Sequence, residues 1–234
     1  MAEKKISRAR KRDLEDPDEF MTFWTKFFNF TAEHKVQVSC ALTFLVVLVI
    51  VAAVTVYFLK KSENKAFLLL QQGVANYQTL VKAGNPDKAY LEAGKDFGVI
   101  MEKYSGRKGG KLARFTYAEM CYAAGEYDKA IANFIKLLVD FNDELFLKNL
   151  ILSDLGYSYK AKKDYKTSAK YFEMIVTTPD YSIKDEALFN LGELYAEIGD
   201  QDKSIDAFKK ILSDHSGSMY TEIVKEKVAW HSKS

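Results

Sequence analysis

Hydrophobic residues dominate one stretch near the start of the chain. Residues 36–59 read VQVSCALTFLVVLVIVAAVTVYFL and contain no charged side chain. As an α-helix this run would be about 36 Å long, which exceeds the ~30 Å hydrocarbon layer of a bilayer. Lys35 precedes the run and Lys60 and Lys61 follow it, where long side chains reach lipid head groups. The pattern predicts one transmembrane helix over residues 36–59.

Other interpretations of this run fit less well. A buried core helix would not need so long an uncharged stretch. A cleaved signal peptide would begin earlier, have a shorter apolar region and end in an A-x-A-like site. A lipoprotein anchor would place its cysteine after the apolar run, whereas Cys40 lies near its beginning.

Aromatic residues gather just before the predicted span. Phe20, Phe23, Trp24, Phe27 and Phe28 recur at helical spacing. Aromatics on one helix face beside a span are typical of a helix lying in the membrane interface. A short helix packed against another subunit would give the same pattern, and the sequence leaves both interpretations open.

After the span the pattern becomes that of amphipathic helices, and it repeats. Residues 188–212 read LFNLGELYAEIGDQDKSIDAFKKIL, and residues 152–176, LSDLGYSYKAKKDYKTSAKYFEMIV, align with them at an offset of 36. Residues 114–138, RFTYAEMCYAAGEYDKAIANFIKLL, lie a further 38 positions upstream. Self-similarity at this period predicts a solenoid of helix pairs. The chain has three prolines, so few positions interrupt helix, and we expect an all-α fold.

These copies resemble the tetratricopeptide repeat (TPR) family, whose pattern is Leu-Gly, then Tyr, a turn Gly, a small residue and an aromatic. The resemblance implies a right-handed TPR-type α-solenoid following the single transmembrane helix. Its signature positions are Gly125, Ala130 and Phe134 in the first copy, Leu155, Gly156, Tyr159, Ser168 and Phe172 in the second, and Leu191, Gly192, Tyr195, Gly199, Ser204 and Phe208 in the third.

Each signature position has a physical reason. Gly156 and Gly192 lack side chains, so we expect two helices to approach closely there. Gly125 and Gly199 suit the left-handed conformation that ends a helix. Lys163 replaces the turn glycine in the second copy and would cost about 1 kcal/mol if that turn is left-handed.

The predicted organisation has five parts. A basic tail and the aromatic helix occupy 1–35, the transmembrane helix 36–59, and a degenerate leading helix pair 60–110. Three TPR-like repeats fill 111–216, at about 111–144, 149–180 and 185–216, and a capping helix and tail form 217–234.

Composition and motifs give no sign of catalysis. The net charge of +2 indicates no nucleic-acid-binding field. His34, His215 and His231 have no companion ligands at suitable spacing, so we expect no metal, no cofactor and no small-molecule substrate. The segment SGRKGGKL at 105–112 lacks the phosphate-loop pattern, and we interpret it as a flexible connector. We therefore expect a protein that is not an enzyme.

In a TPR solenoid the first helix of each repeat lines a concave groove, and aromatic anchors there suit capture of a peptide or helix of a partner protein. The groove positions implied by the resemblance are Phe115, Glu119, Tyr122, Ser153, Tyr157, Lys160, Phe189, Glu193 and Glu197.

The order of parts resembles the YfgM-like family, ancillary subunits of the SecYEG translocon. Supporting residues are KYSG at 103–106 and DHSGSMYTEIVKEKVA at 214–229. The resemblance implies a bacterial inner-membrane scaffold whose partners include the bilayer, the translocon and periplasmic chaperones. Basic residues before the span favour a cytoplasmic N-terminus and a periplasmic repeat domain. The alternative is an assembly or regulatory subunit of a membrane complex with its repeats in the cytoplasm.

Overall fold

The computed structural model describes residues 19–231, and every regular element in that range is an α-helix. The basic segment 1–18 and residues 232–234 lie outside the described residues. The chain divides into two compact units, 1–60 and 61–234, and the boundary falls inside a helix. The all-α prediction is confirmed.

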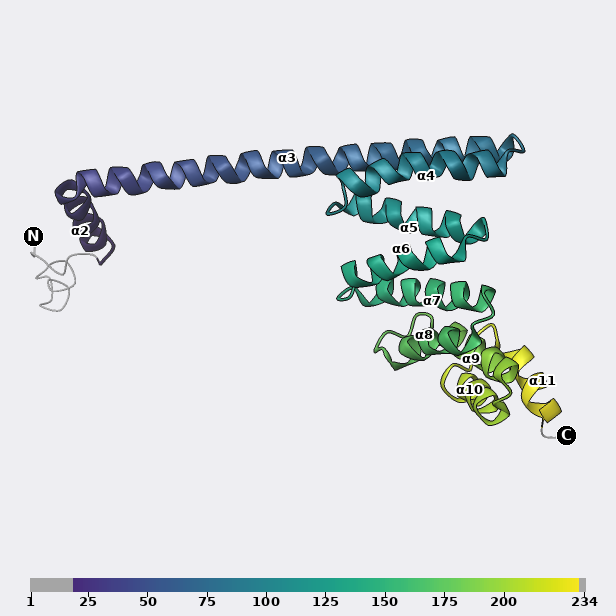
Figure 1. Ribbon diagram of the computed structural model, residues 1–234. Coiled ribbons are helices and arrows are strands. Elements are labelled where there is room, and N and C mark those ends of the chain that lie inside the picture. The colour runs from purple at the N-terminus through teal and green to yellow at the C-terminus, as the bar shows by residue number, and fades with distance from the viewer. Residues whose placement is uncertain (1–18, 232–234) are drawn as a thin grey trace, which may run out of the picture. The chain divides into compact units, whose positions relative to one another are not determined.

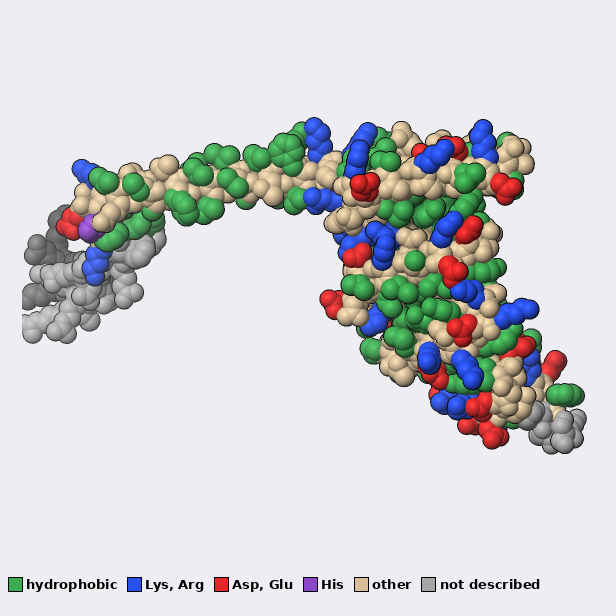
Figure 2. Space-filling view, in the orientation of Figure 1, with side chains coloured by type: hydrophobic (Ala, Val, Ile, Leu, Met, Phe, Trp, Pro, Cys, Tyr) green, Lys and Arg blue, Asp and Glu red, His purple; other side chains and the backbone are tan. Residues whose placement is uncertain are grey.

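The first unit contains α2 (Glu19–Glu33) and the beginning of α3 (Lys35–Lys82). On α2 the rings of Trp24 and Phe27 meet edge to face with centroids 5.8 Å apart, and Phe28 is 62% exposed. α3 is the one helix in residues 19–231 that is long and apolar enough to cross a membrane; its most apolar 18-residue window has a mean hydropathy of 2.9 and no buried residue. Figure 2 shows mostly hydrophobic side chains along this part of α3.

The second unit begins with the C-terminal part of α3 and continues through eight helices in chain order. They are α4 (Pro86–Lys103), α5 (Lys108–Ala123), α6 (Tyr127–Asp140), α7 (Leu145–Ala161), α8 (Tyr165–Thr177), α9 (Lys184–Ile198), α10 (Gln201–Asp214) and α11 (Thr221–His231). From α4 onward each helix packs against the next, and α5 to α10 form three successive antiparallel pairs (Figure 1). This is the arrangement of a helical solenoid.

In the second and third pairs, an aromatic ring of the second helix lies on the first helix. A Cβ atom added at Gly156 would lie 2.6 Å from the Phe172 ring, and one added at Gly192 would lie 2.3 Å from the Phe208 ring. No side chain fits at such distances, so only glycine admits the ring. The predicted close approach is therefore an approach of a phenylalanine ring to a bare helix backbone.

A buried hydrogen bond accompanies each of these contacts. The Ser168 hydroxyl donates to the Gly156 carbonyl and the Ser204 hydroxyl to the Gly192 carbonyl, both at 2.7 Å. These bonds satisfy buried hydroxyl groups that would otherwise destabilise the core. In the first pair Ala118 and Ala130 are fully buried, and no hydroxyl stands at either position.

The leading helix pair uses the same device. A Cβ added at Gly73 on α3 would lie 3.1 Å from the ring of Phe97 on α4, which is fully buried. Gly73 and Phe97 are 24 residues apart, whereas the glycine and phenylalanine of the second and third pairs are 16 apart, so the repeat pattern did not predict this contact.

The interpretation of residues 105–112 as a flexible connector is wrong from Lys108 onward, because α5 begins there. Lys108, Gly109 and Gly110 form the first turn of α5, and both glycines are buried. The Glu63 carboxylate on α3 accepts the backbone N–H groups of Lys108 at 3.1 Å and Gly109 at 2.6 Å. A Cβ at Gly110 would lie 1.8 Å from the Tyr104 carbonyl oxygen, so glycine is required there. The Gly-rich segment is thus a helix start capped by a carboxylate from another helix.

The turns between paired helices have the predicted left-handed conformation. Gly125 has φ 78° and Gly199 has φ 87°, and Lys163, in the same place of the second pair, has φ 63°. Lys163 is the only non-glycine residue with positive φ among the described residues.

Because a side chain in this conformation is strained, we expect Lys163→Gly to raise the free energy of unfolding by about 1 kcal/mol. Urea denaturation of the detergent-solubilised protein measures the change. The matched control, Gly199→Lys, should lower stability by a similar amount. If both variants unfold at the same urea concentration as the parent protein, the turn conformation does not limit stability.

Candidate functional site

The expected groove residues of the first pair lie on one face of α5. Phe115 is partly buried, with its ring 5.8 Å from that of Phe134. Glu119 is exposed, and Tyr122 is 38% exposed. Their spacing of four and three residues places them on successive turns of the helix.

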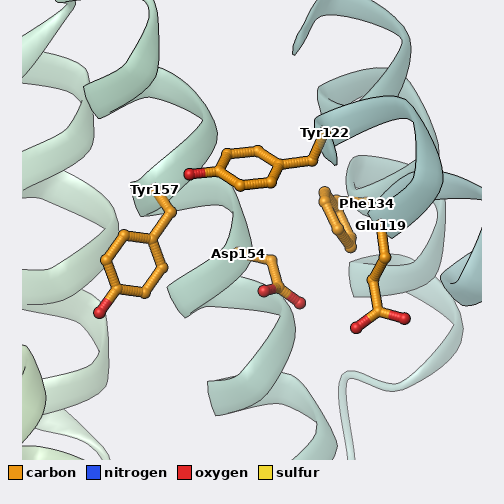
Figure 3. Close-up of a pocket in the computed structure, with 5 residues that line it drawn as sticks. All are labelled: Glu119, Tyr122, Phe134, Asp154 and Tyr157. Carbon is orange, nitrogen blue, oxygen red and sulfur yellow. The ribbon is translucent and has the colours of Figure 1, made fainter. Parts of the chain in front are cut away.

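Two cavities open along α5 and α7. The first has a volume of about 340 Å³ and is lined by Glu119, Tyr122, Phe134, Asp154 and Tyr157. In Figure 3 the carboxylates of Glu119 and Asp154 lie on the same side of this cavity, below the rings of Tyr122 and Phe134. We call it the acidic pocket.

The second cavity has a volume of about 520 Å³ and is largely apolar. We call it the apolar pocket. It is lined by Phe67, Gly106, Lys108, Lys111, Leu112, Phe115, Phe141, Glu144, Leu147, Leu150 and Ile151. Leu112 is 45% exposed and Phe67 37% exposed, so apolar side chains face solvent there.

Most of the expected groove residues of the second pair form hydrogen bonds to side chains of the third pair. Tyr157 donates its hydroxyl hydrogen to Glu186 at 2.6 Å and accepts from the Asn190 side-chain amide at 2.9 Å. Lys160 donates to the Asn190 side-chain oxygen at 3.1 Å. Burial, together with the hydrogen bond to Glu186, raises the pKa of Tyr157. Ser153 is only 5% exposed and offers little surface to a partner. These contacts join α7 to α9.

The third pair is covered by the C-terminal helix. The ring of Phe189 stacks on that of Tyr220 with centroids 4.5 Å apart, and Glu193 forms a 2.8 Å ion pair with Lys227 of α11. Glu197 remains exposed. The accessible part of the expected groove therefore lies on the first pair and on the α7 side of the second.

Comparison with known proteins identifies the repeat. Residues 186–218, which contain α9 and α10, match the tetratricopeptide repeat family. These residues form a tetratricopeptide repeat. Among curated protein sequences none matches the chain.

Solved TPR structures share the fold. A tetratricopeptide repeat protein of Parabacteroides merdae superposes with a TM-score of 0.52 at 14% identity, covering 68% of this chain and 58% of that one. A Podosopora anserina protein with nearly identical TPR-like repeats gives 0.55 at 11% identity, covering 68% and 83%. The apo form of RapI gives 0.51 at 16% identity, covering 64% and 58%. This chain thus spans little more than half the length of two of them, and the likeness concerns the TPR-type fold.

Asp154 is the site residue that the sequence analysis did not find. It lies on α7 of the second TPR copy, three residues before Tyr157, and therefore on the same helix face. Its Oδ2 atom is buried and has no hydrogen-bond partner. A signal was present in the sequence: Asp154 is the only charged residue in the otherwise uncharged stretch from Asn149 to Tyr159.

The environment of Asp154 favours its protonated form. Burial, and then repulsion by Glu119 and Glu186, raises the pKa of this carboxyl to about 7. Both effects destabilise the ionised carboxylate in the folded protein.

The raised pKa makes stability depend on pH in a definite direction. Between about pH 4 and pH 7 the folded state holds a proton at Asp154 that the unfolded chain releases, so stability should fall as pH rises through this window. Asp154→Asn removes the ionisation, and we expect a flatter profile and a gain on the order of 2–4 kcal/mol at pH 8. Thermal unfolding between pH 4.5 and 8.5 measures both.

Glu197→Gln, an exposed acid on α9, serves as the control and should keep the parent profile. If the stability of the parent protein and that of Asp154→Asn depend on pH in the same way, the raised pKa of Asp154 is contradicted.

Proposed function

We propose that this chain is a membrane-anchored TPR scaffold whose groove holds a segment of a partner protein. The observation that carries the proposal is the apolar pocket between α5 and α7, where Leu112 and Phe115 face a cavity of about 520 Å³. Concave apolar surface on a rigid helical array is typical of peptide and helix recognition. The TPR-type fold supports this role, because such repeats bind protein partners.

The apolar part of α3 serves as the anchor. Its window of mean hydropathy 2.9 has no burial within the chain, so lipid is the environment that would cover it. Lysines border the segment at 35, 60 and 61. The aromatic face of α2 lies just before it in the sequence and suits an interfacial position.

We infer that the N-terminus is cytoplasmic and the repeat domain periplasmic, in a bacterial inner membrane. The basic residues that precede the span support this orientation. The resemblance to the YfgM-like family supports a place beside the protein-export channel and periplasmic chaperones. The groove then holds segments of translocon subunits, chaperones or their clients.

Fusing reporters after Ser234 tests the orientation. Alkaline phosphatase should be active, because it needs export, and a cytoplasm-dependent fluorescent protein should stay dark. Fluorescence without phosphatase activity would instead support an assembly or regulatory subunit with its repeats in the cytoplasm.

Site-specific crosslinking in intact cells tests the groove. A photoreactive amino acid at Leu112, 45% exposed in the apolar pocket, should crosslink to a discrete protein partner. The same group at Leu91 on α4, which is 63% exposed and outside both pockets, is the matched control. Mass spectrometry identifies the crosslinked protein. Equal crosslinking at both positions would contradict a groove-specific role, and an identified partner outside protein export would contradict the translocon assignment.

A further inference from the structure

The acidic pocket and the apolar pocket adjoin one another along α5. Phe115 lines the apolar pocket and Glu119, one turn later, lines the acidic pocket. On α7, Ile151 lines the apolar pocket and Asp154, within one turn of it, lines the acidic pocket. The lining therefore changes from apolar to acidic over about 5–6 Å of helix.

The acidic pocket is lined by two carboxyl groups and by no basic side chain. Glu119 and Asp154 line it, and Glu186 is close enough to raise the pKa of Asp154. Of the ion pairs formed within residues 19–231, none includes any of these three carboxylates. Lys160 donates to Asn190 and Lys227 forms its ion pair with Glu193, whereas Lys108 and Lys111 line the apolar pocket.

One oxygen of this pocket has an unused hydrogen-bonding capacity. The Oδ2 atom of Asp154 is buried and has no hydrogen-bond partner. A buried acceptor without a donor is costly, and a ligand that supplies an N–H donor recovers that cost. A cationic donor also relieves the repulsion among the three carboxylates.

Aromatic rings complete the pocket. Tyr122, Tyr157 and Phe134 line it together with the two carboxylates. Aromatic faces attract ammonium and guanidinium groups, Arg more often than Lys. Carboxylates and aromatic rings around one cavity thus suit a basic side chain.

We propose that the groove selects a partner segment in which a Lys or Arg stands two positions from an apolar residue. The basic side chain enters the acidic pocket and the apolar side chain enters the apolar pocket. This inference rests on the proposed function, because it names the chemistry of the segment that the groove binds. In an extended peptide, residues two apart lie on the same side at about 6.6 Å, which is comparable with the length of helix over which the lining changes from apolar to acidic.

Defined peptide pools test this specificity. Three biotinylated twelve-residue pools, random at the remaining positions, carry at the centre Leu-x-Arg, Leu-x-citrulline or Leu-x-Glu, each in both orders. Binding to the full-length protein in detergent is measured for each pool. Citrulline keeps the shape of arginine without its charge, so we expect the Arg pool to bind about fivefold better than the citrulline pool and the Glu pool to bind least.

Variants separate charge from shape. In the double variant Glu119→Gln, Asp154→Asn the Arg pool should fall to the level of the citrulline pool, whose own binding should not change. Glu102→Gln, which removes an exposed acid on α4 outside both pockets, should retain the parent preference. The preference for the Arg pool should also fall at high salt, because it depends on charge.

The outcomes distinguish the two proposals. Equal binding of the Arg and citrulline pools, or a preference that survives in the double variant, overturns the charge specificity and leaves groove binding intact. Binding of no pool above a fully random, leucine-free pool overturns the proposed groove function and this inference with it.

Discussion

The second and third repeats depend on one contact, a phenylalanine ring lying on the bare backbone of a glycine in the preceding helix. Phe172 on Gly156 and Phe208 on Gly192 set the distance between the two helices of a repeat. The serine hydroxyl bond to the same glycine carbonyl then fixes the relative position of the two helices. Because interiors are densely packed, a single added methyl group at either glycine would force the pair apart.

Helix spacing in turn determines the groove. The ring of Phe172, which rests on Gly156, also meets the Tyr157 ring edge to face on the groove side, with centroids 5.4 Å apart. Phe134 likewise packs in the core of the first pair and lines the acidic pocket. The residues that hold each repeat together therefore also shape its binding surface, and groove and core cannot vary independently.

Sequence was sufficient where the determinants lie close together along the chain. The glycine and aromatic positions of a repeat are 16 residues apart, and the left-handed conformation of Lys163 follows from its alignment with Gly125 and Gly199.

Sequence was insufficient where distant segments meet. Glu63 caps a helix that starts 45 residues later, so the start of α5 looked like a connector. α11 covers Phe189 and Glu193 from beyond the last repeat. Burial, and then repulsion by Glu119 on α5 and Glu186 on α9, raises the pKa of Asp154. No local pattern encodes these contacts.

The cap formed by Glu63 has a consequence for separation of the repeats from the apolar part of α3. Lys60 and Lys61 follow the apolar run directly, and Glu63 comes only two residues after the second of them. A protease that cuts after Lys61 would release a fragment that retains Glu63, whose carboxylate caps α5. Cleavage after Lys65 would remove Glu63, and the backbone N–H groups of Lys108 and Gly109 would lose their hydrogen-bond acceptor. Shedding at one lysine or the other would thus yield fragments of different lifetime.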